Sequence, residues 1–184
     1  PLDDDDNTGL AGQLSVAHQL HKSSGNWVLN VTSDTDYIQS NFRTIERLYR
    51  PEFNRDWNIE TLTSSQRLSD LGDQLFVRMG TQLAHTEKGE LKYQFQHLNF
   101  GDNYDGNRHL FFTKLNFDRF QLYSNSSLLQ TAALFTNSMF YRSDNRLKYS
   151  YNKGWSGVNF STEHNEKKQV ELDEFDPISQ KFQT

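Results

Sequence analysis

Cysteine is absent from this 184-residue sequence, and proline occurs only three times. Without cysteine the chain can form neither a disulfide framework nor a cysteine-based metal site or nucleophile. The GxSxG, GxGxxG, P-loop and HExxH patterns are also absent, and the six histidines are scattered. These absences predict no catalytic residue, no cofactor and no metal site, so a function other than catalysis is favoured.

Long hydrophobic runs are lacking too. Only 34% of the residues are hydrophobic, and no run reaches the roughly 18 apolar residues of a transmembrane helix. The net charge of −5 and the lack of a lysine and arginine stripe argue against a nucleic-acid partner. Aromatic residues, in contrast, make up 14% of the chain. That share is too high for a disordered chain, so the sequence should fold.

Apolar and polar residues alternate along most of the chain with the two-residue period of a β-strand. In residues 75–84, the odd positions are mostly apolar and the even positions mostly polar or small. After a turn at 86–89, further strands are predicted at 91–96, 111–118, 120–124, 128–142, 147–152 and 158–163, with a loose stretch at 101–107 and a turn at 143–145. Connections this short cannot make parallel crossovers. The predicted fold is therefore all-β, an antiparallel meander of hairpins.

The pattern changes near the beginning of the chain. Residues 14–21 and 27–32 predict another hairpin, residues 1–9 form an acidic tail, and residues 34–70 form an irregular charged excursion. Within the excursion, Phe42, Ile45 and Tyr49 would share one face of a short helix that ends before Pro51. We expect residues 1–184 to form a single β domain. The start at Pro1, without methionine or a signal pattern, suggests a mature product or part of a longer polypeptide.

The strands predict one apolar and one polar face. The apolar side chains include Leu75, Val77 and Met79, then Phe111, Leu115 and Phe117, and then Leu147, Tyr149 and Tyr151. Their polar counterparts are Arg78, Lys92, Lys114, Lys148 and Glu163. Several of these segments are longer than the five or six residues usual in a soluble sandwich. Long alternating strands are typical of barrels that face lipid outside and water inside. We therefore predict that the five charged residues face the lumen of such a barrel.

The alternating segments, together with the block Phe53-Asn54-Arg55-Asp56-Trp57-Asn58, resemble parts of outer-membrane β-barrel proteins of the Bacteroidota type. The resemblance covers residues 27–169 and transfers no catalytic residue. It implies a membrane β-barrel or a segment of one, in a bacterial outer membrane, with a role in transport, channel formation or envelope assembly. The implied partners are outer-membrane lipid and other envelope proteins.

Two alternatives follow from the residues themselves. A secreted or surface β-sandwich could bind glycans by stacking Trp27, Trp57 or Trp155 on sugar rings. A β-sheet hydrolase would need a pair of carboxylates, for which Glu90, Asp118 and Glu163 are the candidates.

Overall fold

The computed structural model describes residues 9–21, 26–42, 53–59, 72–133 and 136–169, which contain eight strands and one short helix. In chain order the elements are β1 (Ala11–His21), β2 (Trp27–Ile38), α1 (Phe53–Asp56), β3 (Gln74–His85), β4 (Gly89–Phe100), β5 (Tyr104–Phe117), β6 (Phe120–Ala133), β7 (Thr136–Tyr151) and β8 (Gly154–Gln169).

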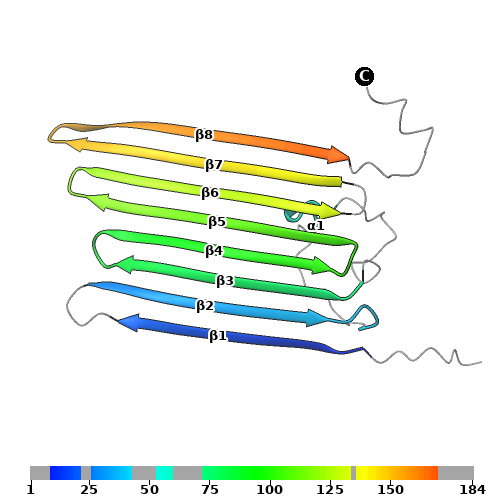
Figure 1. Ribbon diagram of the computed structural model, residues 1–184. Coiled ribbons are helices and arrows are strands. Elements are labelled where there is room, and N and C mark those ends of the chain that lie inside the picture. The colour runs from blue at the N-terminus through cyan, green and yellow to red at the C-terminus, as the bar shows by residue number, and fades with distance from the viewer. Residues whose placement is uncertain (1–8, 22–25, 43–52, 60–71, 134–135, 170–184) are drawn as a thin grey trace, which may run out of the picture.

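All eight strands belong to one antiparallel sheet, in which each strand pairs with its neighbours in the chain. Figure 1 shows this meander as a single layer, with β1 and β8 at opposite edges and α1 behind the sheet. The predicted all-β antiparallel meander is confirmed. Within the described residues, the sheet is not closed on itself.

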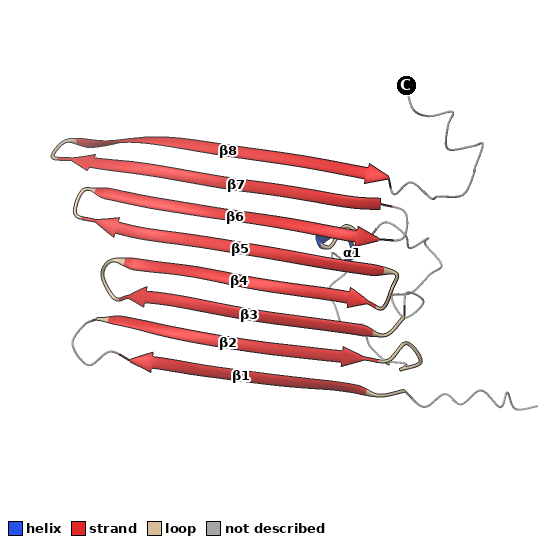
Figure 2. Cartoon of the chain, viewed as in Figure 1, coloured by secondary structure: helices blue, strands red, loops and turns tan. Residues whose placement is uncertain are grey.

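Short turns join three pairs of strands at one end of the sheet, on the left of Figure 2. These turns are residues 86–88, 118–119 and 152–153, and this end is called the short-turn end below. Gly89 follows the first turn with a φ of 105°, and a Cβ there would lie 1.9 Å from the carbonyl oxygen of Lys114. Only glycine fits this position, because any side chain would collide with the neighbouring backbone.

The opposite end of the sheet, called the α1 end below, carries the long connection between β2 and β3. The carboxylate of Asp73 joins the two sides of this connection. It accepts hydrogen bonds from the Ser40 backbone N–H and the Tyr37 hydroxyl, both at 2.9 Å. These bonds hold the pKa of Asp73 below its usual range.

The excursion begins later than the sequence indicated. The expected start at residue 34 is wrong, because β2 continues through Ile38. Asp36 lies within the strand and accepts a hydrogen bond at 2.9 Å from Arg78 on β3. The helix α1 follows Pro51, whereas the helix expected before it falls on residues 43–52, outside the described residues. The acidic tail likewise lies outside them, apart from Gly9.

Three other expected boundaries are wrong. The loose stretch at 101–107 is mostly strand, because the turn is confined to 101–103 and β5 begins at Tyr104. The predicted segment 120–124 is part of the longer strand β6. The single strand predicted at 128–142 is wrong, because β6 ends at Ala133 and β7 begins at Thr136, and the turn predicted at 143–145 lies in the middle of β7.

Cross-strand hydrogen bonds explain why residues 143–145 do not turn. The hydroxyls of Ser126 and Ser143 are 2.7 Å apart, and Ser161 donates to Asp144 at 2.7 Å. Asn145 accepts from Ser124 at 2.6 Å. Serine, aspartate and asparagine side chains often stabilise turns by hydrogen-bonding to nearby backbone groups. In this sheet they bond to side chains of the adjacent strands instead.

This register predicts a specific disulfide. Ser126 and Ser143 are direct partners on β6 and β7, and opposed residues on antiparallel strands have Cα atoms about 4.5–5.5 Å apart, which suits a disulfide. We expect Ser126→Cys combined with Ser143→Cys to form an intramolecular disulfide on mild oxidation, detected as a mobility shift on non-reducing gels.

The matched control is Ser126→Cys combined with Arg142→Cys, because Arg142 lies on the other face of the sheet. Cross-linking of the control pair with equal yield would contradict the register.

Candidate functional site

The strand register separates the side chains onto two faces. The face that carries the odd residues of β2, β3, β4, β5 and β7 and the even residues of β1, β6 and β8 is called the apolar face. Among the described strands, every exposed large hydrophobic side chain lies on it except Tyr123 and Trp155. These side chains are Leu14, Val16, Leu20, Val31, Met79, Tyr93, Phe111, Phe117, Phe120, Leu122, Tyr141, Leu147, Tyr151, Val158 and Phe160.

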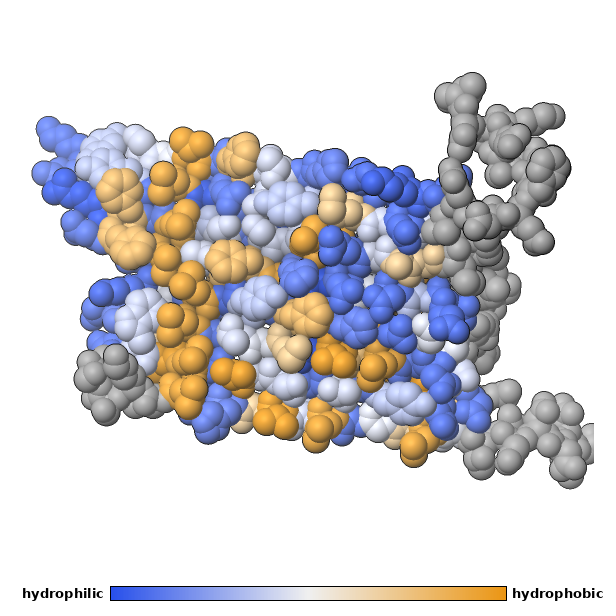
Figure 3. Space-filling model, in the orientation of Figure 1, coloured by the Kyte–Doolittle hydropathy of each residue, from blue (hydrophilic) through white to orange (hydrophobic). Residues whose placement is uncertain are grey.

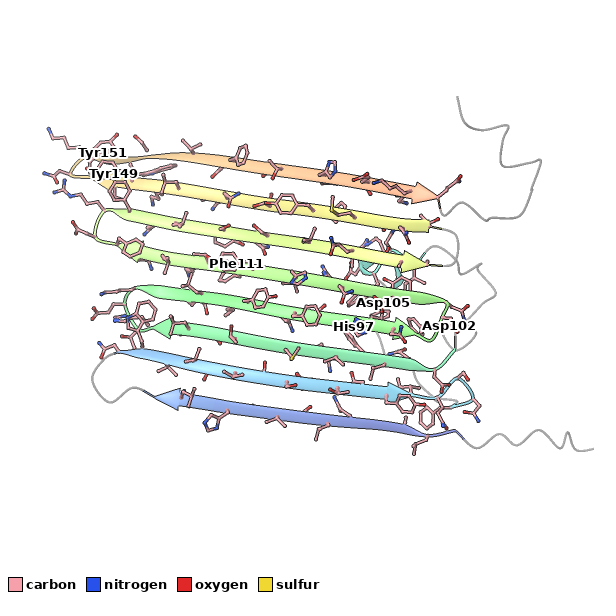
Figure 4. The ribbon with its side chains drawn as sticks, in the orientation of Figure 1. His97, Asp102, Asp105, Phe111, Tyr149 and Tyr151 are labelled. Carbon is pink, nitrogen blue, oxygen red and sulfur yellow. The ribbon has the colours of Figure 1, made fainter. Side chains whose placement is uncertain are left out.

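Figure 3 shows the apolar face, with hydrophobic side chains running across the strands near the short-turn end. One row across four neighbouring strands consists of Leu115, Leu122, Leu147 and Val158. Aromatic side chains lie outside this row, toward the turns. The rings of Phe120 and Tyr149 have centroids 4.8 Å apart, those of Tyr149 and Tyr151 are 6.4 Å apart, and Figure 4 labels both tyrosines.

Several polar side chains within the apolar face bond to one another, although the buried Thr113 hydroxyl on β5 has no such partner among the described residues. Ser124, Ser126, Ser143 and Asn145 form a chain of side-chain hydrogen bonds between β6 and β7. Ser143 is buried beneath its neighbours. Satisfied hydroxyl and amide groups lower the cost of placing these residues in apolar surroundings.

Carboxylate, lysine and arginine side chains occur on the apolar face only toward the α1 end, among the described strand residues. Apart from histidines, the acidic and basic side chains on it among the described strand residues are Asp105, Glu166 and Lys168, all in the last two rows at this end. His97 lies 3.7 Å from the carboxylate of Asp105, and Figure 4 shows both near the end of β4 and the start of β5. The band free of these charges therefore extends from the short-turn end across most of the sheet.

The opposite face is called the charged face. Its described strands carry Asp34, Asp36, Arg78, Glu90, Lys92, Arg108, Lys114, Arg142, Asp144, Arg146, Lys148, Glu163 and Lys167. The structure thus brings Arg78, Lys92, Lys114, Lys148 and Glu163 to one face. That this face lines a lumen stays a prediction.

Part of this charge is paired. Arg78 contacts Asp36 at 2.9 Å, Lys92 contacts Glu90 at 2.9 Å, and Arg142 contacts Asp144 at 3.2 Å. The first pair is partly buried. The other two are more exposed, so they contribute little to stability.

A hydrophobic core covers the charged face at the α1 end. Trp57, which follows α1, is 2% exposed, and its indole meets the Phe76 ring edge-on at 5.5 Å. Leu98 and Phe100 beneath this segment are fully buried. The Tyr104 hydroxyl donates a hydrogen bond to the Trp57 carbonyl. This segment is therefore packed onto the sheet as a small covering layer.

The alternation of apolar and polar residues does not predict this core, although the sequence contains a signal for it. Phe76, Leu98, Phe100 and Leu129 are apolar residues on the charged face, out of phase with the alternation. They gather at the end of the sheet from which the long connection leaves. Apolar residues on an otherwise polar face indicate that something covers them there.

The three tryptophans do not form a common binding platform. Trp27 lies on the apolar face with its ring edge-on to His85 at 4.8 Å, and Trp155 is 64% exposed on the charged face. Trp57 as a sugar-stacking residue is wrong, because its indole is buried in the core. Only Trp155 keeps a largely open ring.

The candidate carboxylates are also separated. Glu90 is on β4 and Glu163 on β8, so four strand spacings, roughly 19 Å, lie between them in this sheet. Asp118 lies in the turn between β5 and β6. Paired glycosidase carboxylates lie within about 10 Å of each other, so Glu90 and Glu163 do not form such a pair.

Comparison of the chain with known proteins assigns it to no family. No family model matches the chain, and neither the curated proteins nor the solved structures contain a significant match to it. In the described part of the chain, no group of three or more histidine and carboxylate side chains is arranged to hold a metal ion. None of the described helical residues forms a helix long and apolar enough to cross a membrane.

Trp57 should anchor its segment. We expect Trp57→Ala to lower the free energy of unfolding by about 3–5 kcal/mol, because it leaves a large cavity in the core. Denaturant titration followed by circular dichroism measures this change.

Trp155→Ala is the control, since its side chain is mostly exposed and its loss should cost no more than about 0.5 kcal/mol. Equal destabilisation by the two substitutions would show that Trp57 does not hold the core together.

Proposed function

We propose that the chain forms part or all of the wall of a β-barrel in a bacterial outer membrane, where it serves in transport, channel formation or envelope assembly. The observation that carries this proposal is the concentration of exposed large hydrophobic side chains on one face of a single sheet, opposite a charged face. Water-facing surfaces rarely expose apolar patches larger than a few hundred Å². In this proposal, lipid covers the apolar face.

The dimensions support a lipid-facing surface. From the row of Phe117 and Phe120 to the row of Met79 and Phe95, the band spans eight residues, or roughly 26 Å along the strands. A strand tilt of about 40° reduces its height to about 20 Å, near the roughly 25 Å apolar band of outer-membrane barrels. The aromatic side chains at the short-turn end match the interfacial aromatic girdle of such proteins.

The sheet edges also support assembly into a larger or closed structure. β1 and β8 have 11 and 16 residues, and each lacks a partner on its outer side among the described strands. Long unpaired edges promote association, and in lipid their backbone groups need internal hydrogen-bond partners. In the proposed barrel, β1 and β8 pair with each other or with further strands.

The charged face would line the interior. Lysine facing the lumen costs little, whereas lysine on the lipid face near the midplane costs about 2–4 kcal/mol. The segment around Trp57 packs on this same face, so it would narrow the lumen at the α1 end. The proposed partners are outer-membrane lipid and other envelope proteins.

Adjacent lysine substitutions test the proposal. Phe111, labelled in Figure 4, is 45% exposed in the middle of the apolar band, and Leu110 lies beside it on the charged face. We expect Phe111→Lys to destabilise protein folded into lipid vesicles by roughly 2–4 kcal/mol, because it places a charge in lipid. Urea titration monitored by tryptophan fluorescence provides the measurement.

Leu110→Lys is the matched control and should have a much smaller effect, since water would reach it. Native protein that stays monomeric in solution without detergent, together with equal effects of the two lysines, would rule out the membrane proposal and favour a soluble sheet protein.

A further inference from the structure

Four cationic side chains gather on the charged face near the short-turn end. Lys114 and Arg146 lie in one row, separated by Tyr123 on the intervening strand β6. Two strand spacings put their Cα atoms roughly 10 Å apart. Lys148 is two residues beyond Arg146 on β7, and Lys92 is the diagonal neighbour of Lys114 on β4. Together, Lys92, Lys114, Arg146 and Lys148 with Tyr123 and Trp155 are called the cationic strip.

The charge of the strip is only partly neutralised. Among the described residues, Lys114, Arg146 and Lys148 form no ion pair within 4.0 Å, while Lys92 contacts Glu90. Glu90 is also the cross-strand partner of Lys114, and the two charges attract each other over a longer distance. The Arg146 guanidinium instead donates to the amide oxygen of Asn159 at 3.1 Å. The chain as a whole carries a net charge of −5. A local excess of positive charge on an acidic protein favours an anionic ligand.

Aromatic rings are interleaved with these cations. The Phe112 and Tyr123 rings meet edge-on at 5.5 Å, and the Lys92 ammonium lies 5.3 Å from the centroid of Phe112. The Lys148 ammonium lies 5.2 Å from the centroid of Trp155. Tyr123 is 37% and Trp155 64% exposed, so both retain accessible ring surface. Such rings can pack on the apolar faces of a sugar.

We propose that the cationic strip binds an anionic saccharide, with lysine and arginine holding its carboxylate or sulfate groups and the Tyr123 and Trp155 rings packing against its sugar rings. This inference rests on the proposed barrel, in which solutes reach the charged face from the lumen, and it names the class of solute.

The neighbours of the strip favour a saccharide over a single-stranded nucleic acid. Gln121, Asn125 and Asn159 lie on the same face and supply neutral amides, which hydrogen-bond sugar hydroxyls. Glu90 and Asp144 are interspersed with the cations. Their oxygens accept hydrogen bonds from hydroxyl groups, which a saccharide carries on its rings and the interior of an oligothymidylate lacks.

Binding can be measured by titration calorimetry on the full chain in detergent at moderate salt. The probes are a linear hexamer of galacturonic acid, the uncharged maltohexaose and a single-stranded oligothymidylate of similar charge. We expect the uronate hexamer to bind more tightly than the other two. The double variant Lys114→Gln/Arg146→Gln should weaken uronate binding by more than about tenfold, because charge-assisted hydrogen bonds are lost.

Arg55→Gln/Lys168→Gln is the matched control. It removes the same two residue types at the α1 end, and it should change uronate affinity less than about threefold, in keeping with a purely long-range electrostatic effect at moderate salt. Trp155→Leu should also weaken binding, through loss of the stacking surface.

Three outcomes would overturn the inference: no uronate binding, equal weakening in both double variants, or tighter binding of the oligothymidylate. Because the titration requires no membrane, it separates the two proposals. If the two lysine substitutions have equal effects in vesicles but uronate still binds, only the barrel proposal is refuted. If the lysine test gives the expected difference but uronate does not bind, only the saccharide site is refuted.

Discussion

The fold depends on an unbroken two-residue alternation carried in register across seven strand pairs. A slip of one residue in any pair would move all side chains of that strand to the other face. In this sheet such a slip would place Lys92 or Lys114 among the leucines and aromatics, and would move Phe111 among the charges. The short turns limit that slip, because turn type and length fix the register of a hairpin. At Gly89, for example, only glycine fits against the neighbouring backbone. Register and turn geometry therefore keep the two faces distinct.

The distribution of buried surface is unusual for a sheet of this size. The hydrophobic core of the described residues lies on the charged face, under the segment around Trp57. No described residue covers most of the apolar face, although its leucine and aromatic side chains outnumber those in the core. A soluble fold gains its stability by removing such surface from water. This contrast links the fold to the proposal that lipid covers the apolar face.

The alternation made much of the sheet predictable from sequence. Leu75, Val77 and Met79 share a face as expected, and the turn at 86–88 joins β3 to β4. Predictions failed where residue preference competed with pairing. Ser143, Asp144 and Asn145 favour turns, but their side chains find hydrogen-bond partners on adjacent strands. The burial of Trp57 could not be deduced from the two-residue alternation, because this burial depends on contacts with strands that are far away in the sequence.

The membrane-wall account is tested most directly by a spin-label scan along β5 in lipid vesicles. Single labels at residues 109–114 sample both faces of the strand in turn. The account predicts that oxygen, which concentrates in lipid, reaches labels at the odd positions best, while a water-soluble nickel complex reaches the even positions best. Odd-position labels that are immobile and protected from both reagents would contradict it, because they would place the apolar face against protein.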